Sequence, residues 1–389
     1  MPRRVVLRRS DLRGAARLAV DATTGVTDLV EAVHARIASL PGAKATSERT
    51  GGISGLVYRS VRGVTRLVGG GIDRVFGELA PDHPGAPVGP KREAIVAALN
   101  GVLGDHLAAT GNPLATSMAL RQDGRALVLD RAALAERLPD PGRSLLVLAH
   151  GLCMNDLQWQ RDGHDHGAML AREFGFTPLY LHYNSGLHIA ANGAALAGQL
   201  EQLVGQWPQP VQRLVLLGHS MGGLVMRSAL HHATHNGQRW PAHLSDMLFL
   251  GTPHHGAPLE RAGAWVDLLL GAAPYAAPFA RLGRLRSAGI TDLRHGTLLD
   301  AATPAHVPLP ARVRCFALAA DLDPPGGGLK GRLLGDGLVP VASALGQHRD
   351  RVRRLAFAAD RRAMVHGANH MELLSHPAVA AQLQHWLRR

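Results

Sequence analysis

One serine, bracketed by glycines between two apolar segments, constrains this chain more than any other feature. Residues 214–226 read L-V-L-L-G-H-S-M-G-G-L-V-M, which places Ser220 in the pattern G-x-S-x-G. The apolar run before the motif predicts a buried strand, and the apolar run after it predicts the start of a helix. A serine in such a tight turn adopts a strained backbone conformation, so its neighbours at two positions before and after must be small. Gly218 and Gly222 meet this demand, and the stretch is therefore typical of a nucleophile elbow.

The region from residue 143 onward alternates between two kinds of segment. Short apolar runs that read as buried parallel strands are separated by segments with helical periodicity. The expected strands are residues 144–149, 178–183, 213–217, 247–251 and 313–319, and the expected helices are residues 165–174, 189–204 and 377–387. This alternation predicts a mostly parallel central sheet flanked by helices. The fold class that we expect is therefore α/β.

Residues 1–142 differ in pattern and predict a mainly helical N-terminal extension or cap. Helical periodicity covers residues 11–39, 51–79 and 91–110, and the prolines at 81, 84, 87 and 90 indicate a linker. Residues 120–129 read as a hairpin with Asp123-Gly124 at its turn. We therefore expect two domains, the extension of residues 1–142 and a catalytic domain of residues 143–389.

The segment of residues 51–79 has two interpretations. Apolar residues recur at steps of three and four with arginines between them, as in a basic helix that lies on a membrane surface. The same pattern fits a helix that packs on the catalytic core as a cap, and the glycines at 63, 69, 70 and 71 weaken a long continuous helix. We favour the cap, and peripheral membrane contact through residues 51–79 stays open.

An apolar insertion, residues 257–305, separates two of the expected strands. It follows the end of the strand of residues 247–251, where a segment is well placed to cover a site as a helical lid. An ordinary peripheral pair of helices accounts for it equally well.

Charge and cysteine content restrict the partners and cofactors. The net charge is +12, but no nucleic-acid motif is found, aromatic residues make up only 4% of the chain, and the arginines are spread along it. We therefore expect no nucleic-acid partner. Cys153 and Cys315 form neither a disulfide framework nor a metal-ligand cluster, and we expect no metal and no cofactor. With no signal peptide and no run of apolar residues long enough to span a bilayer, we expect a cytoplasmic location.

Serine catalysis requires a histidine base and a carboxylate that orients it. On a sheet of this kind the three follow one another as serine, acid and histidine. Asp336, in G-D-G-L-V-P, is the acid that we favour, because its flanking glycines permit a tight loop after the strand of residues 313–319. The rival acids are Asp321, Asp323 and Asp360.

The base candidate is His370, in a loop just before the final helix of residues 377–387. His366 and His376 are its rivals. Two backbone N–H groups are also needed for an oxyanion hole. We expect one from Met221, directly after the nucleophile, and the other from Leu152, in the loop after the strand of residues 144–149.

Four short motifs together resemble the bacterial lipase and esterase branch of the α/β-hydrolase superfamily. They are His150-Gly151, the hexapeptide G-H-S-M-G-G of residues 218–223, G-D-G-L-V-P of residues 335–340 and N-H-M-E of residues 369–372. The resemblance covers about residues 143–389, whereas residues 1–142 match nothing in that family. It implies the α/β-hydrolase fold, a triad of Ser220, Asp336 and His370, and the hydrolysis of carboxylic esters.

The function that we expect is therefore that of an esterase or lipase working through an acyl-enzyme intermediate. Its partner would be a small-molecule or lipid ester, and the oligomeric state stays open. Two alternatives remain. A thioesterase or acyltransferase would use the same triad, and a membrane-surface binding protein would use only the scaffold.

Overall fold

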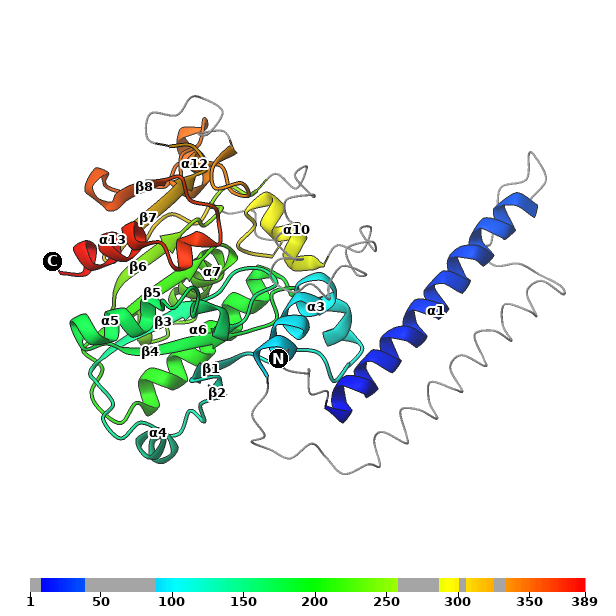
Figure 1. Ribbon diagram of the computed structural model, residues 1–389, viewed down its shortest axis with the longest axis horizontal. Helices are drawn as coiled ribbons and strands as arrows, with labels where there is room; N and C mark the ends of the chain where they lie inside the picture. The colour runs from blue at the N-terminus through cyan, green and yellow to red at the C-terminus, as the bar shows by residue number, and fades with distance from the viewer. Residues whose placement is uncertain (1–7, 39–88, 258–286, 301–305, 325–333, 389) are drawn as a thin grey trace. The chain divides into compact units, whose positions relative to one another are not determined.

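The computed structural model describes residues 8–38, 89–257, 287–300, 306–324 and 334–388 (Figure 1). The chain divides into two compact units. One contains residues 1–92 and 109–115, and the other, which we call the sheet unit, contains residues 93–108 and 116–389. None of the described helices has both the length and the apolar character needed to cross a bilayer.

The strands of the described residues form one eight-stranded sheet, in the order β2-β1-β4-β3-β5-β6-β7-β8. Strands β3 to β8 run parallel, whereas β1 pairs antiparallel with both β2 and β4. The strands are β1 (Ala119–Gln122), β2 (Arg125–Ala126), β3 (Ser144–Ala149), β4 (Thr177–His182), β5 (Arg213–His219), β6 (Leu244–Leu250), β7 (Arg314–Asp321) and β8 (Arg362–His366). The mostly parallel sheet predicted from the sequence is confirmed.

Helices cover both faces of this sheet, and successive strand residues point to opposite faces. On β3, Leu145 and Val147 pack in the core beneath α6 (Ile189–Gln206) and α7 (Met221–His235). Leu146 and Leu148 pack in the other core, beneath α5 (His166–Phe174) and α13 (Pro377–Leu387). Both faces of β3 are therefore buried, which explains its continuous apolar sequence.

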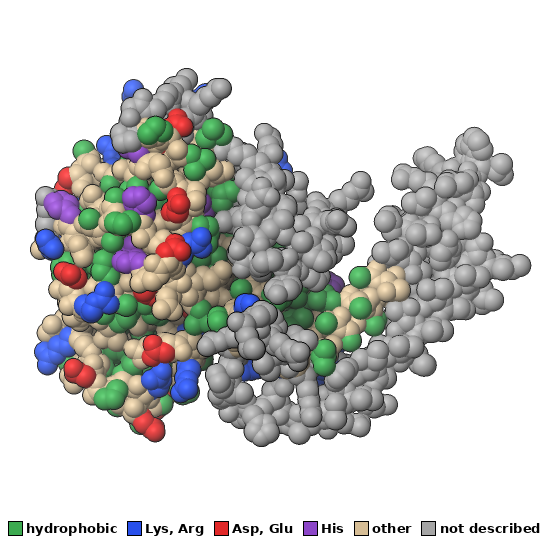
Figure 2. Space-filling view, in the orientation of Figure 1, with side chains coloured by type: hydrophobic (Ala, Val, Ile, Leu, Met, Phe, Trp, Pro, Cys, Tyr) green, Lys and Arg blue, Asp and Glu red, His purple; other side chains and the backbone are tan. Residues whose placement is uncertain are grey.

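The described residues also form four further α-helices besides α1 (Arg9–Ala38). They are α3 (Pro90–Ala109), α4 (Arg131–Arg137), α10 (Ala288–His295) and α12 (Val341–Ala344). On the face seen in Figure 2, basic and acidic side chains of the described residues are intermixed, so the net positive charge is not gathered into one patch there.

The first unit contains the long helix α1 (Arg9–Ala38). Asp11 in its first turn accepts a hydrogen bond from the Arg8 backbone and forms an ion pair with Arg92. Further along α1, the Gly14 carbonyl accepts from the Asn112 side chain at 3.1 Å. Helices predicted at residues 11–39 and 91–110 are thus confirmed.

Other expectations for residues 1–142 have mixed outcomes. The hairpin is present as β1 and β2, with Asp123 and Gly124 at φ 51° and 70° in its turn. In the main sheet β2 is the edge strand and β1 lies between β2 and β4, so this part of the predicted extension lies within the sheet unit. The helix expected at residues 51–79 lies outside the described residues, as does most of the expected lid; α10 falls within the range 257–305.

Candidate active site

Ser220 lies between β5 and α7 in a backbone conformation that is unusual for a residue with a side chain. Its φ is 54° and its ψ is −124°, a strained region that residues other than glycine rarely occupy. The Ser220 amide donates to the Leu250 carbonyl at 2.9 Å, which ties the turn to the end of β6. The predicted strand, strained turn and helix are all present.

The two bracketing glycines are needed because backbone atoms approach them closely. A methyl group at Gly222 would lie 2.2 Å from the Ala149 carbonyl oxygen, and one at Gly218 would lie 2.6 Å from the Gly223 nitrogen. Neither backbone neighbour can move away without disrupting the sheet or the helix. The steric reason for the G-x-S-x-G pattern is therefore visible in this turn.

Asp336 and His370 form a buried pair. His370 Nδ1 lies 2.6 Å from Asp336 Oδ2, and the His370 amide donates to the Asp336 carbonyl at 3.0 Å. The second carboxylate oxygen accepts from the amides of Leu338 and Val339 at 3.0 and 2.8 Å. Because Nδ1 must donate to the carboxylate, Nε2 is the ring nitrogen left to accept a proton.

This pair lies next to the elbow. His219, the residue before the serine, contacts His370 through its ring, with centroids 4.6 Å apart, and through a 3.0 Å hydrogen bond from Nε2 to the His370 carbonyl. Gly251, next to the Leu250 that binds the Ser220 amide, has a positive φ of 56°. A methyl group there would lie 3.1 Å from Asp336 Oδ2 and 3.2 Å from His370 Cε1. Both contacts bring the three predicted residues to one edge of the sheet.

The rival residues have other partners. His366 Nδ1 lies 3.0 Å from Asp321 Oδ1, so the rival acid and the rival base pair with each other. The side chain of His376 accepts from the Ala378 amide at the start of α13. The Asp323 carbonyl accepts from the Gly367 amide, and Asp360 is exposed.

The loop after β3 and the start of α7, where the sequence predicted the two oxyanion-hole donors, both lie next to Ser220. Met221 is the first residue of α7, so its N–H has no acceptor within the helix. A methyl group at Gly151 would lie 3.0 Å from Ser220 Cβ, which shows how closely the loop approaches Ser220. The Cys153 amide is already bonded to Ser185 Oγ, so it does not compete with the predicted Leu152 amide as a donor from this loop.

Two buried histidines beside the site are neutral. Burial, and then the neighbouring His370, keep the pKa of His219 well below its ordinary value. Burial lowers the pKa of His150 to about 3. His150 Nδ1 lies 2.9 Å from the Gly151 carbonyl and donates to it. Neither ring therefore places a second positive charge near the base.

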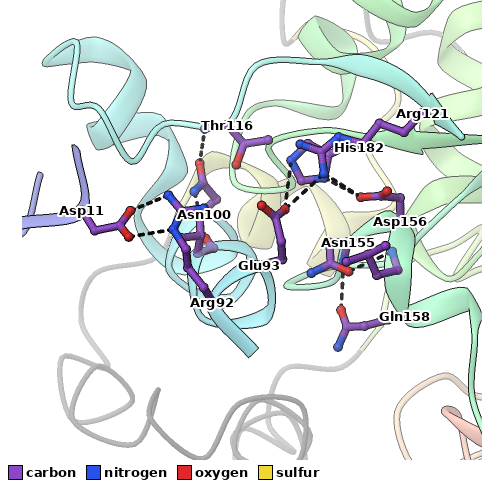
Figure 3. Close-up of polar contacts among 12 residues, drawn as sticks. Asp11, Arg92, Glu93, Asn100, Thr116, Arg121, Asn155, Asp156, Gln158 and His182 are labelled. Carbon is purple, nitrogen blue, oxygen red and sulfur yellow. Dashed lines mark hydrogen bonds and ion pairs between the residues drawn. The ribbon is translucent and has the colours of Figure 1, made fainter. Parts of the chain in front are cut away.

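Glu93, Asp156 and His182 are the one set of described residues whose geometry is compatible with a metal ion, their ligand atoms all lying within 4.8 Å of one another. Figure 3 shows Arg121 among them. Its Nη1 lies 3.1 Å from Glu93 Oε2 and 3.2 Å from Asp156 Oδ1. This guanidinium contacts both carboxylates, so the cluster forms an ion-pair network with Arg121.

Sequence reasoning did not identify the residues that hold the elbow, the Asp336–His370 pair and the loop after β3 together. His219 and Gly251 make the contacts between the elbow and the acid-base pair, and Tyr183 and Ser185 bind the loop after β3. The only available signal was position, since each lies at the carboxyl end of a parallel strand, where functional residues gather in open α/β sheets.

Comparisons with known proteins give one family match. Residues 147–293 match the PGAP1-like alpha/beta domain, a stretch that begins within β3 and includes β4 to β6 and α7. No curated protein matches the sequence.

Solved structures with related folds include lipases and esterases. A lipase of Bacillus licheniformis is 20% identical, with 64% of this chain and 92% of that chain covered and a TM-score of 0.40. Lipase B of Aspergillus fumigatus is 14% identical, with 68% and 59% covered and a TM-score of 0.38. An esterase of Thermogutta terrifontis is 17% identical, with 64% and 90% covered and a TM-score of 0.36.

Proposed function

We propose that this chain, which has the α/β-hydrolase fold, is a serine hydrolase that cleaves carboxylic esters. The observation that supports it most is the buried Asp336–His370 pair, with 2.6 Å between Oδ2 and Nδ1, beside the strained turn at Ser220. A serine hydroxyl is a weak nucleophile at neutral pH, and this arrangement supplies both the base and the group that orients it.

In the proposed reaction, His370 Nε2 takes the hydroxyl proton of Ser220 as the Ser220 Oγ bonds to the ester carbonyl carbon. Asp336 fixes the ring with Nδ1 protonated and stabilises the positive charge that forms on it. The proton then passes from His370 to the departing alkoxide, which leaves as the alcohol. In the second half of the reaction, His370 takes a proton from water as the water oxygen bonds to the carbonyl carbon of the acyl-serine. His370 then returns the proton to Ser220 Oγ, and the carboxylic acid leaves.

The carbonyl oxygen becomes negative in each tetrahedral intermediate. The amides of Leu152 and Met221 would donate to this oxyanion, and the N-terminal end of α7 adds a favourable dipole. Removing one such donor from a serine hydrolase typically costs about 10²–10³ in kcat.

The decisive experiment compares wild-type protein with Ser220→Ala and Ser228→Ala. Ser228 also lies on α7 and is buried, but its hydroxyl donates to the Leu298 carbonyl. We expect short p-nitrophenyl esters and a fluorophosphonate probe to react with the wild type and with Ser228→Ala, and not with folded Ser220→Ala. Full activity in Ser220→Ala would exclude the proposal.

Substrate class can be resolved with the same protein. A chain-length series of oxygen esters, run beside matching thioesters and with an added alcohol acceptor, separates an esterase or lipase from a thioesterase or an acyltransferase. We expect the oxygen esters to be hydrolysed, with water as the acceptor.

A further inference from the structure

The last residue of β4 and the segment that follows it contact the oxyanion loop at three points. We define the oxyanion loop as residues 150–156, which join β3 to the 3₁₀ turn η1 (Asp156–Trp159). His182, Tyr183 and Ser185 each bind a different residue of this loop. The three contacts lie on both sides of Leu152, the candidate donor.

Tyr183 binds the start of the loop. Its hydroxyl donates to the His150 carbonyl at 2.8 Å, and its ring stacks on the His150 ring with centroids 4.3 Å apart. Tyr183 is 2% exposed, and burial raises the pKa of its phenol, so the hydroxyl keeps its proton and remains a donor. The carbonyl that precedes Gly151 is thereby fixed in direction.

Ser185 binds the loop on the other side of Leu152. Its Oγ accepts from the Cys153 amide at 2.9 Å, and both residues are buried. Cys153 has a φ of 59°, a conformation that a side-chain-bearing residue adopts only when its surroundings impose it. The hydrogen bond to Ser185 helps to hold this strained residue directly after Leu152.

His182 binds the end of the loop within the ion-pair network of Figure 3. Its Nδ1 lies 2.9 Å from Asp156 Oδ1, and Arg121 contacts the same carboxylate. Burial alone would raise the pKa of Asp156, but His182 and Arg121 hold it below its ordinary value. The first residue of η1 is therefore charged and anchored to β4 and β1.

We propose that Tyr183 and Ser185 are positioning residues for the oxyanion hole, with His182 anchoring the end of the loop. This proposal rests on the proposed function, because it assigns these side chains to the same reaction. Two buried hydrogen bonds, one before Gly151 and one after Leu152, fix the orientation of the peptide between them. Small displacements of a catalytic group can cost about 10² in rate.

The test uses Tyr183→Phe and Ser185→Ala, with Tyr180→Phe as the matched control. Phenylalanine keeps the ring that stacks on His150 and removes only the hydroxyl. Tyr180 lies on β4, three residues before Tyr183, and its hydroxyl donates a partly buried hydrogen bond to Asp165 Oδ1 at the start of α5. Tyr180→Phe therefore shows how far kcat falls when a tyrosine hydroxyl that does not contact the oxyanion loop is removed.

We expect kcat for a p-nitrophenyl ester to fall about 10- to 100-fold in Tyr183→Phe and in Ser185→Ala, with KM nearly unchanged. Affinity for a boronic acid that forms a tetrahedral anion on Ser220 should fall in parallel. Tyr180→Phe should retain wild-type kcat. In the variant that combines Tyr183→Phe and Ser185→Ala, the fold reduction in kcat should be smaller than the product of the two single reductions, because both side chains hold one loop.

The outcomes separate this proposal from the proposed function. If the wild type neither hydrolyses esters nor reacts with a fluorophosphonate, the proposed function fails. If the wild type is active and Tyr183→Phe and Ser185→Ala keep its kcat, only the positioning role fails. Equal losses in Tyr183→Phe and Tyr180→Phe, or losses that follow melting temperature alone, would also overturn it.

Discussion

His366 and Asp321 form a second histidine–aspartate pair beside the candidate triad, with 3.0 Å between Nδ1 and Oδ1. Asp321 ends β7 and His366 ends β8, and the two residues are register partners in the sheet. The amide of Ala368 also donates to the Asp321 carbonyl, so this pair supports the loop that leads to His370. The Asp321–His366 pair thus supports the loop that carries His370, whereas the Asp336–His370 pair is the one that adjoins Ser220.

The two aspartates give different predictions for catalysis. Asp336→Asn should lower kcat for esters by about 10⁴, because an amide cannot hold His370 in the tautomer that leaves Nε2 as the base. Asp321→Asn should lower kcat far less and act mainly on stability. Ester kinetics with purified, folded variants make the comparison. A large loss in Asp321→Asn with little change in Asp336→Asn would reverse the assignment of the acid.

Much of the sheet could be predicted because β3, β5, β6 and β7 are buried on both faces and read as mostly apolar runs. The same logic missed β8, since R-A-M-V-H has only three apolar residues and begins with an exposed arginine. Position in the chain and flanking glycines led to Asp336 and His370. Sequence could not reveal that Asp321 and His366 pair with each other, because strand register is a property of the folded sheet.

Two glycines on α6 predict opposite effects on stability. A methyl group at Gly198 meets nothing within 4 Å, so Gly198→Ala should raise the free energy of unfolding by about 0.5–1 kcal/mol. A methyl group at Gly193 would lie 2.2 Å from Ser228 Oγ on α7, so Gly193→Ala should lower it by about 1–3 kcal/mol. Urea unfolding of both variants measures the difference. Stabilisation by both would mean that α6 and α7 pack less closely than described.

The two cysteines should be unreactive in the folded protein. Both are buried, burial raises the pKa of Cys153, and it raises the pKa of Cys315 to about 12. Since the thiolate is the reactive form, a disulfide reagent at pH 8 should modify neither thiol until denaturant is added, and then both. Rapid reaction of Cys153 in the native protein would show that the oxyanion loop opens readily.

His166 predicts that stability falls as the solution becomes acidic. Burial lowers its pKa to about 4, opposed by its hydrogen bond to the Leu373 carbonyl, whereas an unfolded chain has the ordinary value of about 6.5. Between these values the unfolded state binds a proton that the native state does not. The free energy of unfolding therefore rises with pH across this window and declines as pH falls through it, by at most about 1.4 kcal/mol per pH unit for this group. Urea unfolding at pH 7 and pH 5 should show a smaller difference in His166→Asn than in the wild type. An unchanged difference would mean that His166 is protonated in the native protein near the same pH as in the unfolded chain.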